Sequence, residues 1–202
     1  MSSPDIKITA EPIDNDRCKF IVNQPVHAGG VRRFASADEA TGSPLAAAIF
    51  GIPAAGVAEV IVSGNLVTVV KRGPTPWTAI GTSVGAAIRA ALSTRAPAVT
   101  PRETAAASTD DDSLYEQVAQ LFETKVNPMV ARHGGAVELI DVQDGVVMLR
   151  MGGGCQGCGM ADVTLRQGIE AMLREHAPAV KGLVDVTDHS SGSNPYFASA
   201  KK

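Results

Sequence analysis

Hydrophobic residues recur with two periods along the chain, and these periods predict a mixture of strands and helices. In the first half, runs rich in β-branched residues at 18–23, 60–62 and 66–71 predict strands, and the last two form a hairpin turned at Ser63-Gly64-Asn65. Apolar residues three or four apart predict a helix from Trp77 to Leu92, with one face packed on that hairpin. The first half therefore has the pattern of a small α+β domain.

Two hydroxyl-proline pairs mark the beginnings of helices in this half. A hydroxyl side chain caps a helix and proline is favoured at the first helical position, so Ser43-Pro44 predicts a short helix ending at Phe50. Thr75-Pro76 repeats the arrangement before the longer helix. We expect Trp77, which belongs to the apolar stripe of that helix, to be a core residue and not a recognition aromatic.

The second half opens with a helical pattern that a proline interrupts. Apolar residues from Leu114 to Val130 have helical spacing, and the acidic Asp110–Asp112 before them form a solvated, electrostatically favourable helix entrance. Pro128 removes a backbone hydrogen bond inside this pattern, so we expect a kink or a restart at Asn127. The helix is expected to stop at Gly134-Gly135.

Two strands, a second helix and a last strand complete the second half. The strands are joined through Gln143-Asp144-Gly145, and the helix is capped near Asp162 and ends before Pro178. The strands are predicted at 137–142, 146–151 and 183–186, and the apolar side of the helix extends from Leu165 to Leu173. The predicted order in this half is α-β-β-α-β.

A segment of different composition separates the two halves. Residues 94–112 are rich in Ala, Thr and Pro, end in an acidic run and lack apolar periodicity, as in a flexible linker. We therefore predict an α+β protein of two small mixed domains, at 1–93 and 113–189, followed by a tail at 190–202. In the tail, a frayed terminus is the simpler interpretation and docking of Asn194–Phe197 the alternative.

Composition narrows the classes of function. With 45% apolar residues among 202 and a net charge of −3, the chain has a globular composition without the basic field that a nucleic-acid groove needs. The longest apolar stretch, at 45–62, is interrupted by Gly and Pro, so we expect no membrane span. The amino terminus lacks the pattern of a secretion signal or a transit peptide, and we expect a cytoplasmic protein.

Candidate chemistry is concentrated in the run Gly153-Gly154-Cys155-Gln156-Gly157-Cys158-Gly159, between the second predicted strand and the helix. Two thiols two residues apart can face one metal, and the glycines allow backbone amides to approach bound sulfur. The positive end of the following helix favours thiolate, which is the form of cysteine that binds metal or attacks a disulfide.

Cys155 and Cys158 supply only half of the four thiolates that common iron-sulfur clusters and structural zinc sites use. Cys18, in a predicted strand of the other domain, is more simply a core residue. A second chain is the simpler source, so the pattern predicts a cluster that bridges a homodimer about a twofold axis and is exposed enough for release.

Two other interpretations remain open from the residues alone. A C-x-x-C pair before a helix also builds a redox dithiol, although no aromatic residue precedes it and no parallel βαβ unit surrounds it. A structural zinc site or an inert pair is the third possibility. The histidines are weaker candidates: His133 and His176 stand at predicted helix ends and can meet the last carbonyls, and His27 and His189 lie in predicted solvated loops.

The segment from Leu114 to about Val186 resembles the NifU carboxy-terminal domain of iron-sulfur cluster scaffold and carrier proteins. The resemblance rests on the paired glycines before the first strand, the Gly-x-Cys-x-x-Cys pattern and several positions of the following helix. These residues are Gly134, Gly135, Gly153, Cys155, Cys158, Thr164, Leu165, Gly168, Ile169, Glu170, Pro178 and Val180.

The first half resembles the companion Nfu amino-terminal domain. The matching residues are Lys19-Phe20, Ser43-Pro44-Leu45-Ala46, Ile49-Phe50, Gly56-Val57, Val67-Thr68-Val69 and Trp77. The resemblance implies a non-catalytic carrier that holds a labile cluster, 4Fe-4S in preference to 2Fe-2S, between two subunits. It also implies Cys155 and Cys158 as ligands, upstream assembly proteins as donors and apo-proteins as acceptors, with a thiol-disulfide oxidoreductase as the alternative function.

Overall fold

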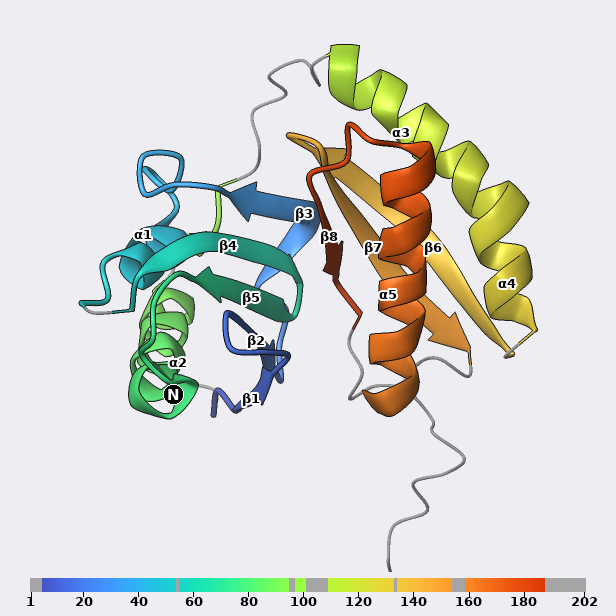
Figure 1. The fold of residues 1–202 in the computed structure, drawn as a ribbon. Coiled ribbons are helices and arrows are strands. Elements are labelled where there is room, and N and C mark those ends of the chain that lie inside the picture. The colour runs from blue at the N-terminus through green and yellow to red at the C-terminus, as the bar shows by residue number, and fades with distance from the viewer. Residues whose placement is uncertain are drawn as a thin grey trace, which may run out of the picture. The chain divides into compact units, whose positions relative to one another are not determined.

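A computed structural model describes residues 5–53, 55–94, 97–100, 109–132, 134–153 and 159–187 of the chain. The chain divides into two compact units, residues 1–103 and 104–202 (Figure 1). Each unit combines helices with one sheet, so the α+β composition and the two-domain organisation predicted from the sequence are both found.

The first unit contains a five-stranded antiparallel sheet in the order β1-β2-β5-β4-β3. Its strands are β1 (Ile8–Pro12), β2 (Arg17–Val22), β3 (His27–Phe34), β4 (Val57–Gly64) and β5 (Leu66–Lys71). Two helices, α1 (Pro44–Phe50) and α2 (Trp77–Ser93), share its core. Phe20, Val62 and Val69 from the sheet meet Leu45 and Ile88 from the helices in one buried cluster.

The three central strands are where the sequence pattern predicts them, and both edge strands were missed. β4 and β5 form the expected hairpin, with Ser63 opposite Leu66 across a two-residue turn. β1 is mostly solvent-exposed and ends at Pro12, and β3 carries two glycines and two arginines. Edge strands tolerate such residues because one side makes no ladder hydrogen bonds, so composition alone does not reveal them.

The two predicted helix starts differ from the structure in detail. Ser43 does precede α1, but its hydroxyl makes no capping bond; it accepts a hydrogen bond from Thr100 N at 3.0 Å and lies 2.5 Å from Thr100 Oγ1. Pro76 is itself the residue before α2, so the prediction of a Thr75 cap with Pro76 as the first helical residue was wrong. The expected apolar face of α2 is buried: Trp77, Ile80, Val84, Ile88 and Ala91.

The chain differs from the expected linker at both ends. After α2, Ala98 and Val99 are buried in the core of the first unit, and Ala98 O accepts a hydrogen bond from Leu45 N at 3.0 Å. At the other end, α3 begins at Thr109, within the segment expected to be linker. Residues 101–108 lie outside the described residues.

The second unit contains a three-stranded sheet in the order β6-β7-β8. β6 (Gly135–Gln143) and β7 (Val146–Gly153) are antiparallel, and β8 (Gly182–Asp185) lies parallel to β7. Helix α5 (Gly159–His176) joins the two parallel strands (Figure 1). Val147, Leu149 and Met151, on one face of β7, share a core with Val118 of the preceding helix and Ile169 of α5.

The expected restart at Asn127 is confirmed. α3 (Thr109–Leu121) continues into a π-helical segment, η1 (Phe122–Val126), and then into α4 (Asn127–Ala131). Asn127 N donates to Phe122 O, five residues earlier, so the turn widens immediately before Pro128. Pro128 then occupies the first turn of α4, immediately after this widened turn.

The β6–β7 hairpin turns through two residues in the left-handed region, Asp144 at φ 53° and Gly145 at φ 77°. The turn is anchored by Asp111 in the first turn of α3, whose carboxylate accepts hydrogen bonds from Asp144 N and Gly145 N, both at 3.0 Å. Asp111 is 7% exposed. The expectation that all three acidic residues of 110–112 are solvated was therefore wrong for the middle one, because its carboxylate is buried against the turn and accepts both of these hydrogen bonds.

Candidate functional site

The two candidate ligands, Cys155 and Cys158, lie outside the described residues, as do all five residues at 154–158. The structure describes the backbone on either side of them: β7 ends at Gly153 and α5 begins at Gly159. The predicted helix cap at Asp162 differs from this placement, because Asp162 is inside α5 and the helix begins directly after the second cysteine.

The end of β7 is held on both sides as it approaches the cysteine pair. On one side, Gly153 pairs with Gly135 and Met151 with Val137 in the antiparallel ladder. On the other side β8 has ended, and the next residues extend the contact: Val186 N donates to Leu149 O at 2.8 Å. The carboxyl-terminal part of β7, which leads into the cysteine pair, is therefore hydrogen-bonded to a neighbouring segment on each side.

A buried threonine hydroxyl adds a further hydrogen bond to this end of β7. Thr187 Oγ1 accepts a hydrogen bond from Met151 N at 2.7 Å, and the Thr187 hydroxyl also bonds to the Asp185 carboxylate. Thr187 is fully buried, and Asp185 Oδ1 accepts a second bond from Thr187 N at 2.8 Å. Neither role is predictable from the sequence, because threonine and aspartate after a short strand show no periodicity or spacing that marks them.

The start of β6 is tied to the helix that precedes it. Asn127 Oδ1 accepts a hydrogen bond from Val137 N at 3.1 Å, and Gly134 has the left-handed φ of 73° that turns the chain into the strand. The sequence predicts the restart at Asn127 but not this contact of its side chain. His133, between these features, is outside the described residues.

The helix after the pair is fixed by its apolar face. Ile169 and Leu173 are buried in the core of the second unit and Leu165 packs against it, as the spacing predicts. A Cβ added to Gly168 would lie 3.9 Å from Met129 Cε, so α5 and α4 approach closely there. An N-terminal helix end following directly after two thiols stabilises their anionic form.

The third cysteine is a core residue, as predicted. Cys18 lies on β2 in the first unit, is 1% exposed and belongs to its hydrophobic cluster. Burial raises the pKa of the Cys18 thiol to about 12, with backbone and charge effects of Glu11 contributing less. At neutral pH this sulfur is a buried thiol and not an available thiolate ligand.

Of the two described histidines, His176 ends a helix as predicted, whereas His27 does not lie in a loop. His27 begins β3 and is 8% exposed, so its predicted position in a solvated loop was wrong. The residues before it are typical of a turn and do not reveal that a strand starts at His27. His176 ends α5, where Lys125 Nζ lies 2.5 Å from its Nε2 and Gln117 Nε2 donates to its backbone carbonyl at 2.9 Å. His189 and the tail are outside the described residues.

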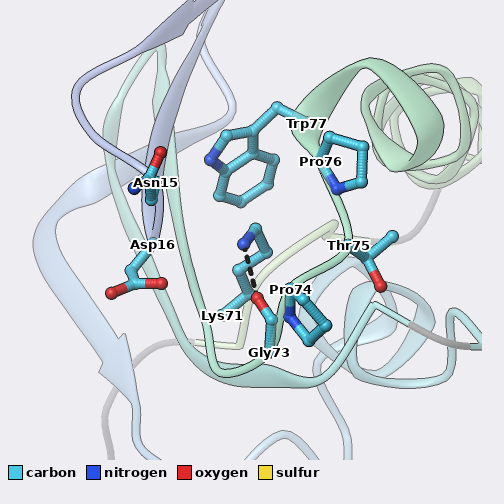
Figure 2. Close-up of a pocket in the computed structure, with 8 residues that line it drawn as sticks. All are labelled: Asn15, Asp16, Lys71, Gly73, Pro74, Thr75, Pro76 and Trp77. Carbon is cyan, nitrogen blue, oxygen red and sulfur yellow. Dashed lines mark hydrogen bonds between the residues drawn. The ribbon is translucent and has the colours of Figure 1, made fainter.

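Trp77 is 9% exposed and packs edge-on against Phe20, with ring centroids 6.3 Å apart, so the core prediction is confirmed. Its indole also forms one wall of a pocket of about 480 Å³ that the sequence analysis missed (Figure 2). Among the described residues, no helix has both the length and the apolar character required to cross a bilayer.

Comparison with protein families gives two matches in chain order. A model described as the scaffold protein Nfu/NifU N-terminal domain matches residues 6–95, and a model described as a NifU-like domain matches residues 118–184. The first contains all five strands of the first sheet. The second extends from α3 into β8 and includes the positions of both Cys155 and Cys158.

Relatives of similar sequence are bacterial proteins named Fe/S biogenesis protein NfuA. That of Ectopseudomonas mendocina is 51% identical over 89 residues, which are 44% of this chain and 46% of the relative. That of Stenotrophomonas maltophilia is 52% identical over 98 residues, 48% of this chain and 49% of the relative. The matches thus span about half the length of these curated relatives.

Among solved structures, protein SAV1430 from Staphylococcus aureus matches 41% of this chain and 95% of its own length, at 16% identity and a TM-score of 0.33. The family assignment rests instead on the two domain matches and on relatives that are about 50% identical over somewhat less than half of this chain. With the Nfu amino-terminal domain followed by the NifU-like domain, the chain belongs to the Nfu-type, NifU-like family.

Proposed function

We propose that this protein is an iron-sulfur cluster scaffold or carrier. Cys155 and Cys158 from each of two chains hold one labile cluster, 4Fe-4S in preference to 2Fe-2S, and pass it to apo-proteins. The observation that carries the proposal is the NifU-like match over 118–184, which spans the thiol pair, in a chain whose relatives are named for Fe/S biogenesis.

The chemistry proposed for the thiols is ligand exchange without net redox change. A thiolate of the acceptor protein binds a cluster iron as a thiolate of Cys155 or Cys158 leaves it, and the proton lost by the acceptor thiol passes to the departing sulfur or to buffer. The cluster is cargo in this reaction, so the chain needs no catalytic turnover. The helix end after Cys158 supports the thiolate form that the exchange requires.

Support for two chains comes from the count of thiols. Each chain has three cysteines, and Cys18 is buried in the other unit with a thiol pKa of about 12. A four-thiolate shell then takes two ligands from each of two chains about a twofold axis. Upstream assembly proteins load the cluster, and a cytoplasmic location fits thiols that must stay reduced.

The experiment is anaerobic reconstitution of the full chain with iron and sulfide. Wild type, Cys155→Ser, Cys158→Ser and Cys18→Ala are compared by visible absorption, by iron and sulfide content, and by mass in solution. Wild type and Cys18→Ala should bind about one cluster per two chains and become dimeric. Both serine variants should lose the chromophore and the dimer together, since each removes two of the four thiolates.

Two outcomes contradict the proposal. Loss of the cluster in Cys18→Ala, with the fold intact by circular dichroism, would show that the wrong thiols were chosen. A wild-type chain that stays colourless and monomeric after reconstitution, yet turns over a disulfide substrate with a dithiol reductant, would instead identify a thiol-disulfide oxidoreductase.

A further inference from the structure

The residues that line the pocket beside Trp77 include no cysteine, so the proposed cluster binding gives this pocket no role. It lies in the first unit, where β5 ends, between the β1–β2 turn and the loop that leads into α2 (Figure 2). Its volume of about 480 Å³ is within the range of sites that hold small organic ligands or a single peptide residue.

A buried lysine stands at the centre of this pocket. Lys71 is 3% exposed and lies on the face of β5 that also carries the buried Val67 and Val69. Its Nζ donates to Gly73 O at 3.0 Å and lies 5.4 Å from the centroid of the Trp77 ring. One carbonyl therefore uses one of the three donors of the ammonium group.

Lys71 forms no described ion pair with an acidic side chain, and Asp16, the acidic residue in the pocket lining, is solvent-exposed. The ion pairs described in the first unit include Lys7–Asp5, Arg17–Asp14 and Arg33–Glu59, and Lys71 takes part in none of these. A buried ammonium without a counter-charge is costly to desolvate, and an anion entering the pocket offsets that cost.

The remaining walls are of two kinds (Figure 2). Trp77, Pro74 and Pro76 form an apolar side, and Asn15 and Asp16 stand opposite them on the β1–β2 turn. The Asn15 amide offers a second hydrogen-bond donor. Asp16 is solvent-exposed and adds one negative charge to the pocket lining, which opposes the binding of an anion.

The polar wall is fixed in place without a ligand. Asp14 Oδ1 accepts hydrogen bonds from Asp16 N at 2.9 Å and Arg17 N at 2.8 Å, and Asp14 O accepts one from Trp77 Nε1 at 3.2 Å. Partial burial raises the pKa of the Asp14 carboxyl, but the Arg17 side chain and the backbone donors lower it further, so it stays ionised. A preorganised wall loses little entropy when a ligand binds.

We propose that this pocket binds a carboxylate joined to a small apolar group. The Lys71 ammonium and the Asn15 amide hold the carboxylate, and the apolar group lies against Trp77 and the two prolines. A small organic acid and the carboxyl-terminal residue of a peptide both have this chemistry, and the two arms of the test separate them.

The test uses the fluorescence of Trp77, which is the single tryptophan of the chain and therefore reports this pocket alone. The full chain is titrated with 3-phenylpropionate and with 3-phenylpropionamide. In the second arm it is titrated with an acetylated tripeptide ending in phenylalanine, with either a free or an amidated carboxyl terminus. The acid of at least one pair should give a saturable change that its amide does not give.

Three variants test whether binding of the acid depends on the charges of Lys71 and Asp16. Lys71→Met keeps the aliphatic stem and should weaken binding of the acid by at least about tenfold, the effect of one charge-assisted hydrogen bond. Asp16→Asn removes the opposing charge and should tighten it. Lys7→Met makes the same change of charge at an exposed lysine of the same unit and should leave the affinity unchanged.

Several results would overturn the proposal: no saturable change with either acid, an amide that binds as well as its acid, or equal weakening in Lys71→Met and Lys7→Met. If Lys71→Met fails to fold by circular dichroism, the exposed Asp16→Asn decides. Tighter binding of the acid then supports the proposal, and unchanged or weaker binding refutes it.

Discussion

Replacing Asp111 by alanine tests whether the second unit depends on one carboxylate to hold its hairpin turn. Asp111 Oδ1 accepts a hydrogen bond from Gly145 N and Oδ2 accepts one from Asp144 N, each at 3.0 Å. The bond to Gly145 is buried, and that to Asp144 is partly buried. Alanine removes both acceptors and adds none.

The expected loss follows from these two bonds. A hydrogen bond to a charged acceptor contributes about 1.5–3 kcal/mol when the donor is left buried without a partner. The Gly145 donor has that full effect, and water partly replaces the acceptor of the Asp144 donor, so the two together give about 3 kcal/mol. With a urea dependence of about 1.5 kcal/mol per molar for a unit of this size, the midpoint should fall by about 2 M.

The assay is urea unfolding of the full chain followed with two probes. Fluorescence of Trp77 reports the first unit, and far-ultraviolet circular dichroism reports both units. Asp111→Ala should lower the midpoint of the transition seen by circular dichroism and leave the fluorescence transition in place. Asp110→Ala is the matched control, because Asp110 is exposed in the same helical turn and should change stability by no more than about 0.5 kcal/mol.

Equal shifts of the dichroism transition in Asp111→Ala and Asp110→Ala would refute the claim that the Asp111 hydrogen bonds stabilise the turn. That result would mean that only the charge at the start of α3 matters and that the bonds to the turn contribute nothing. A shift of the fluorescence transition alone would also refute it, because Asp111 and the hairpin turn belong to the second unit.

Three smaller predictions concern single contacts. Thr187→Val removes the acceptor of Met151 N and should lower the unfolding free energy of the second unit by about 1–2 kcal/mol, measured by circular dichroism in urea. Asn127→Ala removes the acceptor of Val137 N and should lower it by about 1 kcal/mol in the same assay. Because burial raises the pKa of Cys18 to about 12 while the unfolded thiol ionises near 9, stability should fall as pH rises from about 9 to 12. Urea midpoints from tryptophan fluorescence should therefore drop more between pH 8 and pH 10 in wild type than in Cys18→Ala.

The elements that the sequence predicts well are those whose periodicity is caused by burial. The stripe of α2, the strands β4 and β5 and the helix face from Leu114 to Val130 are all found, because each has one face in a core. The restart at Asn127 is equally local, since proline acts on its own turn. The edge strands β1 and β3 escape because half-exposed strands need no such pattern.

Contacts between distant positions are what the sequence does not reveal. The position of Ser43 before Pro44 predicts that its hydroxyl caps the helix, yet this hydroxyl bonds to Thr100, 57 residues later. Asp111 sits in an acidic run typical of a solvated helix start, yet it serves a turn 33 residues away. In both cases the local preference is real, and a backbone donor distant in sequence hydrogen-bonds to the side chain instead.

The same distinction applies to the candidate site. Cys155 and Cys158 lie within four consecutive residues, so the pair is recognisable from its spacing alone. Their role as ligands stays a prediction. The support before the pair comes from residues well outside the motif: β6 pairs along β7, and Thr187, 36 residues from Met151, closes the other side. A cluster that must be both held and released needs ligands on a short segment between fixed ends. We therefore expect Thr187→Val to shorten the lifetime of a bound cluster without abolishing its assembly, because the substitution loosens the support and leaves both thiols in place.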